Sequence, residues 1–410
     1  MRDRFVATVA LSTLVVLVAV APLAGVASAD VTEPRAAASV AAEPVAPGAA
    51  GLTGPTTDGV ASLQQQCTEG EASYPLEVED NTSATVTIEE APETVVTLGP
   101  SAAQTVWELG ADDKVVGVTQ FAAYLEGAGE KTNVSTSQFA VYDAEAIVAA
   151  DPDVVLAPNI VFESEVTRLR EAGLTVYKFD PATSIEDIQR KTLLTGALVD
   201  DCEAARETNR WVRQNLDAVT GAVESREPVR ALYVSFGQTT GGDTFTHSMI
   251  EASGATNVVN EAGQTGYVFP VNQELVAEQD PEWLVLTNPN SRVPEQAPYN
   301  QTTAGEEGNV VVVSSNWLNQ PAPRSVVFAV RNMTEAFHGD VYGPESYVSR
   351  EEAARTPTPT TTTGTTTTDT TDSTTAEPTT ADDGQAQPGF GAVVAVVAVL
   401  GALALLRRRD

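Results

Sequence analysis

Two stretches of the chain, EAIVAADPDVVL at residues 145–156 and ELVAEQDPEWLVL at residues 274–286, follow the same plan. Each predicts a short helix that ends at an Asp-Pro pair, because proline cannot continue a helix and disfavours helical backbone in the residue before it. The apolar run after each Asp-Pro pair predicts a buried strand. The recurrence of this unit in both halves of the chain indicates two related α/β lobes.

The sequence around these two units also alternates apolar runs with helical patterns. In the first half, strands are predicted at 84–88, 94–98, 115–118, 154–157 and 174–178, with helices at 101–109, 143–150 and 163–172. In the second half, strands are predicted at 229–235, 283–287 and 310–313, with helices at 245–252, 272–279 and 325–337. This alternation is typical of α/β proteins, so we expect a mostly parallel sheet in each lobe, at 76–183 and 227–347.

Residues 184–226 contain no proline and predict a long, rigid connecting helix between the lobes. Ser184 and Asp187 have the spacing of a capping box at its start. A helix of this length would reach about 60 Å at 1.5 Å per residue. An interruption at Asp200-Asp201 would instead give two consecutive helices.

The composition restricts the partners of the protein. The 410 residues carry a formal net charge of −33, which excludes nucleic acid because its phosphates would be repelled. Hydrophobic residues make up 42% of the chain, enough for a sizeable core, so simple disorder explains the acidity poorly. We interpret it as adaptation to high salt, where a Debye length of about 3 Å at 1 M removes most of the repulsion.

Both ends of the chain point to the outside of a cell. Residues 1–29 have the basic start, apolar centre and small-residue exit of a signal peptide, although an N-terminal membrane span is the alternative. A flexible leader is expected at 30–75 and a threonine-rich, O-glycosylated stalk at 348–387. The apolar run and arginines at 388–410 predict a membrane anchor, which places the protein at the outer face of the cytoplasmic membrane. Four sequons predict glycosylation at Asn81, Asn133, Asn300 and Asn332.

The reactive residues are few. Cys67 and Cys202 are the only cysteines, and an oxidising exterior favours a disulfide between them. With only His247 and His338 available as further ligands, we expect no metal site. No nucleophile-elbow or zinc-protease motif occurs, so we predict no catalytic residues, no cofactor and a role other than that of an enzyme. We also expect the loop at 237–242 to be a flexible edge of a cleft, since it lacks the order of a phosphate-binding motif.

Several passages together resemble a known family. They are VVTLGPSAA at 95–103, WELGA at 107–111, VVGV at 115–118, the Asp-Pro strand, the long connector and Asn316-Trp317. In order and spacing they resemble the helical-backbone substrate-binding proteins of ABC importers over residues 76–345, and they are most similar to the vitamin B12-binding subgroup. The end of the chain, from Pro388-Gly389-Phe390 to its arginines, resembles the PGF-CTERM sorting signal of haloarchaeal surface proteins. That resemblance implies removal of the tail and attachment of a lipid.

The family resemblance implies a ligand cleft between the lobes and delivery of cobalamin or a related corrinoid to a dimeric ABC permease with its ATPase. Relatives that bind ferric siderophores or haem give the alternative, and Arg292 and Arg324 are the best candidates for an anionic siderophore. A glycosylated surface protein without a transport role is a third possibility. Glu145 and Glu274 occupy the positions at which the family contacts its permease. Stabilisation of the helix dipole is a compatible explanation of both glutamates.

The resemblance also implies a set of aromatic ligand contacts. Tyr124, Phe236 and Phe269 match family contacts, Tyr267 is adjacent to them, and Trp317 lies in the last loop. The sequence departs from the family pattern at Ser137, where bacterial B12 binders carry tryptophan; Phe139 and Tyr142 are the candidates to replace it. Core packing is the alternative explanation for each aromatic taken singly.

Overall fold

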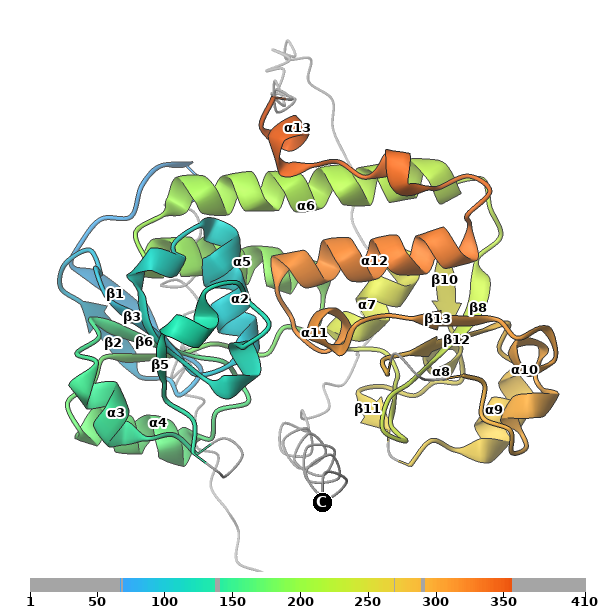
Figure 1. The fold of residues 1–410 in the computed structure, drawn as a ribbon, viewed down its shortest axis with the longest axis horizontal. Coiled ribbons are helices and arrows are strands. Elements are labelled where there is room, and N and C mark those ends of the chain that lie inside the picture. Colours follow the sequence, from blue (N-terminus) through green and yellow to red (C-terminus); the bar gives the residue numbers. More distant parts are fainter. Residues whose placement is uncertain (1–66, 68, 137–140, 269, 289–291, 356–410) are drawn as a thin grey trace, which may run out of the picture. The chain divides into compact units, whose positions relative to one another are not determined.

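A computed structural model describes residues 67, 69–136, 141–268, 270–288 and 292–355. These residues form two parallel sheets with helices around them, which confirms the predicted α/β class (Figure 1). The expected signal peptide, sorting segment and most of the leader and stalk lie outside the described residues, and so do Ser137, Phe139 and Phe269.

The N-terminal lobe contains a five-stranded parallel sheet in the order β5-β4-β3-β6-β7. Its strands are β3 (Val95–Thr97), β4 (Val115–Val118), β5 (Thr132–Asn133), β6 (Val154–Ala157) and β7 (Val176–Lys178), preceded by an antiparallel hairpin of β1 (Leu76–Glu79) and β2 (Thr85–Ile88). Its helices are α2 (Pro100–Leu109), α3 (Ala144–Ala149) and α4 (Glu163–Glu171), with 3-10 turns at Asp112–Lys114, Gln120–Ala122 and Ala128–Glu130. Helix α2 contributes to one hydrophobic core cluster and α3 and α4 to another, so β6, buried at every position, is covered on both faces.

The C-terminal lobe contains a four-stranded parallel sheet in the order β10-β8-β12-β13. Its strands are β8 (Val229–Val234), β10 (Ala255–Asn257), β12 (Trp283–Leu286) and β13 (Val310–Val312), and a separate small sheet pairs β9 (Thr239–Thr240) with β11 (Tyr267–Val268). Helices α7 (Phe245–Ala252), α11 (Ser315–Leu318) and α12 (Pro323–Phe337) share one core cluster; α8 (Val258–Glu261), α9 (Gln273–Gln279) and α10 (Thr303–Glu307) share another.

The connector is two helices rather than one, α5 (Ile185–Leu198) and α6 (Cys202–Val223). The predicted capping box at Ser184 starts α5. The break falls at Asp200, whose φ of +55° a continuous helix does not allow. Both helices pass between the lobes: the start of α5 and the end of α6 pack in the C-terminal core, while the end of α5 and the start of α6 pack in the N-terminal core.

The folded region is longer at both ends than the sequence predicted. Cys67 and Cys202 form the expected disulfide, and both are buried at the start of α6. The Tyr74 hydroxyl donates to the carbonyl oxygen of Ala197 at 2.9 Å, so the end of the expected leader is packed. At the other end, a short helix α13 (Arg350–Arg355) follows a segment whose Val348 carbonyl accepts a hydrogen bond from the Trp211 indole at 2.9 Å. Packed residues therefore extend beyond the expected boundaries at 75 and 347.

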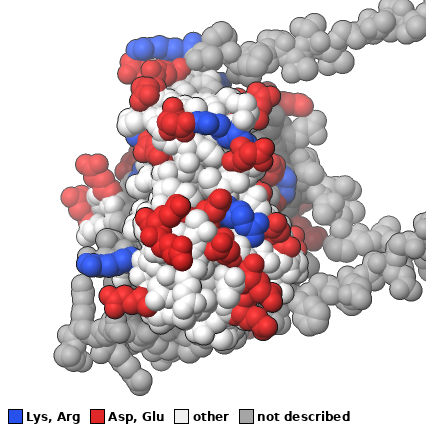
Figure 2. Space-filling view, turned by 90° about the vertical axis from the view of Figure 1, so that its right-hand side faces the viewer, with Lys and Arg blue, Asp and Glu red and all other residues white. Residues whose placement is uncertain are grey.

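Acidic side chains are spread over the side of the C-terminal lobe. Figure 2 looks onto the side of the C-terminal lobe and shows Asp and Glu across its described face with few Lys or Arg between them. On this face, acidity is therefore spread out rather than gathered at one binding site. Within the described residues, no helix is both long and apolar enough to cross a membrane.

Candidate functional site

Helix α11 lies where the two lobes meet (Figure 1). The carbonyl oxygen of Asn316 accepts a hydrogen bond at 3.2 Å from the side chain of Gln104 on α2, in the N-terminal lobe. The carbonyl oxygen of Leu318 accepts one at 3.3 Å from the hydroxyl of Thr246 on α7, in the C-terminal lobe. Residues of both lobes thus converge on this one helical turn, and three of the predicted ligand contacts lie on or beside it.

Tyr124 reaches this junction from the N-terminal lobe. It follows the 3-10 turn after β4, and its hydroxyl oxygen accepts a hydrogen bond from Gln104 at 2.8 Å. The side chain is only half-buried. Because Gln104 also contacts Asn316, one amide joins the predicted contact Tyr124 to the turn that carries the predicted contact Trp317.

Tyr267 approaches from the C-terminal lobe. Burial raises the pKa of Tyr267 to about 12, against the opposing effect of a hydrogen bond with Thr246. Thr246 is the residue that contacts Leu318, so Tyr267 lies one side chain away from α11. Tyr267 pairs in β11 with Thr240 of β9. The prediction of a flexible loop at 237–242 is therefore partly wrong, because Thr239 and Thr240 form a buried strand.

Phe236 follows β8 and occupies a strained turn. Phe236 and Gly237 have φ angles of +51° and +77°, and Ser235 and Gln238 exchange two backbone hydrogen bonds of 2.9 Å around them. Asn-Gly is the usual pair in such a turn, and an aromatic residue at positive φ is unfavourable. The residue is nevertheless 53% exposed. An exposed aromatic held in a strained backbone favours binding over core packing as its role.

Trp317 has a packing role on at least one face. Its ring centroid lies 5.1 Å from that of Phe328 on α12, and Phe328 also contacts the rings of Trp211 and Tyr347.

Tyr142 is a core residue: it is 6% exposed and its hydroxyl donates to the carbonyl oxygen of Leu98 at 2.9 Å. Its burial does not suit it to replace a ligand-binding tryptophan.

An ion-pair cluster next to the junction was not anticipated. Glu108 on α2 is buried and pairs with both Arg324 on α12 and Arg350 on α13. Arg350 also lies over the ring of Trp211, at 4.4 Å from its centroid. The positive charge of Arg324 is therefore compensated within the protein, which makes it a poor receptor for an anionic ligand. Arg292 is exposed, and no contact of its side chain with another described residue supports such a role.

Gln104 was also missed. It is fully buried on α2, yet its side chain makes contacts in both lobes. The available signal was a glutamine between the buried alanines and valine of α2. That signal is weak, because sequence periodicity marks a residue as buried without showing what it meets.

The two predicted docking glutamates have the same local setting. Glu145 and Glu274 are exposed at the second position of α3 and α9. Each helix is capped by the preceding polar residue: the Asp143 side chain accepts from the Ala146 amide and the Asn272 side chain from the Glu274 amide. Both helices lie on the side of their lobes that faces away from α6 (Figure 1).

The sequons differ in their surroundings. Asn81, Asn133 and Asn300 are exposed, whereas Asn332 is half-buried within α12. The threonines of the last two sequons, Thr302 and Thr334, are both buried and donate to backbone carbonyl oxygens, so the exposure of the asparagine alone separates Asn332 from the others. Exposure favours the first three asparagines as glycan acceptors and disfavours Asn332.

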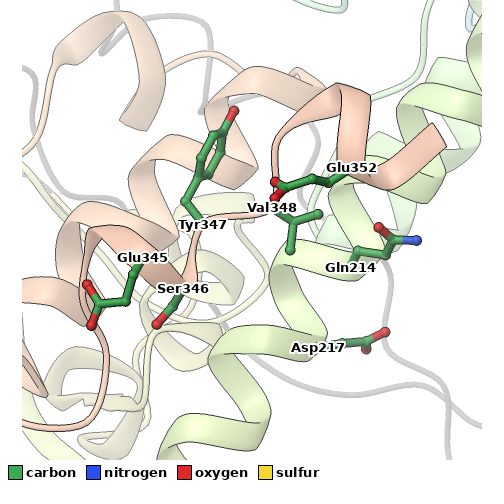
Figure 3. A pocket seen from close by; sticks show the side chains of 7 residues that line it. All are labelled: Gln214, Asp217, Glu345, Ser346, Tyr347, Val348 and Glu352. Atoms are coloured by element: carbon green, nitrogen blue, oxygen red, sulfur yellow. The ribbon is translucent and has the colours of Figure 1, made fainter. Parts of the chain in front are cut away.

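The remaining candidates lie elsewhere. His338 shares a 2.8 Å hydrogen bond with the carbonyl oxygen of Gly254, and no group of three His, Cys, Asp or Glu suited to a metal ion occurs among the described residues. A hollow of about 440 Å³ lies between α6 and residues 345–352 (Figure 3). Its lining comes from Gln214, Asp217, Glu345, Ser346, Tyr347, Val348 and Glu352. None of the predicted ligand contacts that the structure describes lines it, so it is distinct from the junction at α11.

Comparison with known proteins places the chain in a family. Residues 95–316 match the family model described as periplasmic binding protein. The chain belongs to this family. Over 347 residues it is 42% identical to a cobalamin-binding protein of Halobacterium salinarum, a match that covers 82% of this chain and 89% of the relative. It is also 26% identical over 246 residues to the vitamin B12-binding protein of Vibrio parahaemolyticus, covering 58% of this chain and 86% of that protein.

The family membership agrees with the fold. A crystal structure of the heme binding protein HmuT superimposes with a TM-score of 0.56 at 20% identity, over 65% of this chain and 91% of that one. At this identity the match supports the two-lobed fold alone. Residues 387–409 match the PGF-CTERM motif, which confirms the sorting signal expected from the sequence and indicates anchoring at the cell surface through the C-terminus.

Proposed function

We propose that this protein is the surface-anchored substrate-binding component of an ABC importer and that its ligand is cobalamin or a related corrinoid. The observation that carries the proposal is the 42% identity, across most of both chains, to the cobalamin-binding protein of Halobacterium salinarum. In this role the protein binds and releases its ligand unchanged and needs no cofactor. Its partners are a permease dimer and the attached ATPase.

The junction at α11 supports a large ligand with apolar faces and a polar edge. The tyrosines Tyr124 and Tyr267 lie beside it, and Phe236 exposes its ring after β8. Aromatic side chains of this kind pack on a planar macrocycle, and hydroxyl groups meet polar substituents at its rim. The compensation of Arg324 by Glu108 disfavours an anionic siderophore, and the contacts of His338 away from α11 disfavour haem ligation by that histidine.

Titration of the purified protein in high salt with cyanocobalamin, hemin and ferrioxamine B tests the ligand. We expect saturable quenching of tryptophan fluorescence by cyanocobalamin and much weaker responses to the other two probes. Tight binding of hemin or ferrioxamine B without binding of cyanocobalamin would assign the protein to iron uptake instead.

The described region also constrains how the protein would be tethered. Its last helix, α13, lies on the α6 side, opposite α3 and α9, on which we place permease docking (Figure 1). The 31 residues 356–386 separate α13 from the sorting motif. An extended Pro- and Thr-rich chain of that length spans about 100 Å, whereas a folded unit of this size is about 50 Å across. The tether therefore has the reach to let α3 and α9 face the membrane. A signal peptide at 1–29 would deliver the chain to that surface.

A further inference from the structure

The side chain of Gln104 makes four hydrogen bonds while fully buried between the lobes. Its Oε1 accepts from the backbone amide of Ser325 at 3.1 Å and from the Ser325 hydroxyl at 2.9 Å. Its Nε2 donates to the Tyr124 hydroxyl oxygen at 2.8 Å and to the Asn316 carbonyl oxygen at 3.2 Å. Every hydrogen-bonding position of the amide is thus used.

These partners determine which way the amide points. A backbone amide only donates, so the atom of Gln104 that faces Ser325 must be the oxygen. A carbonyl oxygen only accepts, so the atom that faces Asn316 must be the nitrogen. Both partners lie in the C-terminal lobe, and together they leave the second Nε2 hydrogen directed at Tyr124.

Tyr124 must then act as an acceptor towards Gln104, which leaves its own proton for another partner. Burial is the largest influence on the pKa of Tyr124 and raises it, against the hydrogen bond from Gln104, so the hydroxyl is protonated at neutral pH. No acceptor for this proton occurs among the residues that the structure describes. The side chain is half-buried rather than enclosed, so a ligand can supply the acceptor.

We infer that Gln104 is a positioning residue for ligand recognition: it occupies the Tyr124 oxygen and directs the hydroxyl proton to an acceptor on the ligand. For the proposed corrinoid, on which this inference rests, the acceptor is a carboxamide oxygen at the rim of the macrocycle. Asn316 and Ser325 determine the orientation of Gln104. Residues of the C-terminal lobe therefore determine where the Tyr124 hydroxyl, in the N-terminal lobe, directs its proton.

Gln104→Glu reverses this hydrogen bond without changing the shape of the side chain. A carboxylate still accepts from Ser325, but it also accepts the Tyr124 proton and so removes it from the ligand. It no longer donates to the Asn316 carbonyl oxygen, a loss that Gln104→Met shares. Tyr124→Phe deletes the same proton directly. We expect each variant to weaken binding of cyanocobalamin about tenfold. The double variant should bind no more weakly than either single variant, because both changes remove the same hydrogen bond from the Tyr124 hydroxyl to the ligand.

The matched control is Thr105→Val on the same helix. The Thr105 hydroxyl is buried and donates at 2.9 Å to the Ser101 carbonyl within α2, so its loss perturbs the helix without touching Tyr124. We expect unchanged affinity for this variant. Wild-type affinity in Gln104→Glu, or losses that add in the double variant, would overturn the inference. If Gln104→Glu does not fold, Gln104→Met replaces it, with an expected loss of about three- to tenfold and the same overturning result.

All variants are titrated with cyanocobalamin, hemin and ferrioxamine B, each of which carries hydrogen-bond acceptors. A wild-type protein that binds hemin or ferrioxamine B but not cyanocobalamin overturns the corrinoid assignment, and the comparison of variants is then made with the probe that binds. A wild-type protein that binds none of the three overturns both proposals.

Discussion

The two copies of the helix–Asp-Pro–strand unit, α3–β6 and α9–β12, have the same local geometry in different surroundings. Asp151 and Asp280 end their helices with left-handed φ angles of +48° and +40°. Aspartate tolerates this region better than most residues, and the following proline stops the helix. The duplication seen in the sequence is therefore also a duplication of backbone conformation.

The acidic residue after each Asp-Pro pair also has the same role. Asp153 accepts a hydrogen bond from the backbone amide of Thr94 at 2.8 Å, just before β3. Glu282 accepts one from the backbone amide of Arg230 at 2.8 Å, in β8. In each lobe this carboxylate ties the start of the unit's strand to the neighbouring strand of the sheet.

The two units differ in the elements that pack beside them. The Asp280 carboxylate accepts from the amide and hydroxyl of Thr303, at 2.7 and 3.0 Å, and so holds the start of α10. Among the described residues, nothing donates to the Asp151 carboxylate. Local sequence thus specifies the unit, while the neighbouring elements decide which of its polar groups carry further structure.

The largest predicted effect concerns the exposed glutamates of the two units. Glu145→Arg and Glu274→Arg should each reduce uptake of cyanocobalamin about tenfold, and together about a hundredfold. Each variant replaces the negative charge that we propose contacts the permease with a positive charge. Affinity for the ligand should not change. The matched control is Glu203→Arg, at the second position of α6 on the opposite side. An equal loss of uptake in the control would show that all three glutamates act only through the overall surface charge and not through docking.

Replacement of Phe236 compares the ligand contacts of the two lobes. Phe236→Asn suits the positive φ of the turn, so we expect the free energy of unfolding to rise by about 0.5–1 kcal/mol. Affinity for cyanocobalamin should fall about tenfold with loss of the exposed ring. Chemical unfolding and fluorescence titration measure the two effects. A stabilised variant with wild-type affinity would remove Phe236 from the site and leave Tyr124 as the better-supported contact.

Glycine substitutions at the ends of the two helices test the difference between the units. Glycine adopts positive φ without strain, so Asp151→Gly should change the free energy of unfolding by less than about 0.5 kcal/mol. Asp280→Gly also removes two hydrogen bonds to Thr303 and should cost about 1–2 kcal/mol. Urea unfolding in high salt provides the comparison. Equal costs would show that the extra contacts with α10 contribute nothing.

The last prediction is a dependence of stability on pH at Asp153. Although burial opposes it, hydrogen bonds from Thr94 and Glu93 lower the pKa of Asp153 below its usual value. Such a group contributes stability above its unfolded pKa of about 3.9, and this contribution is lost as the pH falls through the folded pKa. Asp153→Asn should cost up to about 1 kcal/mol at pH 7, with little difference from wild type in strong acid. A cost that does not vary with pH would contradict this assignment.

The regular elements were predictable because their patterns are local. The predicted elements at 115–118, 154–157 and 245–252 have the bounds of β4, β6 and α7. The elements that were missed are all short, because segments of this length show little periodicity. They are the two-residue strands, β1, β10, α8, α10, α11 and α13. The packing of Cys67 and Val348 was missed because both contact α6, more than 130 residues away along the chain.

The amino-acid sequence by itself determined the α/β alternation, the two lobes, the pairing of the cysteines and the acidic surface. Each of these follows from local periodicity or from composition. Only the tertiary structure decided which side chains meet at α11, because the bond between Gln104 and Ser325 joins residues 221 positions apart. Sequence patterns report whether a side chain is buried, whereas the packing of the lobes determines its partners. For Gln104, those partners turn an ordinary buried amide into the group that orients Tyr124.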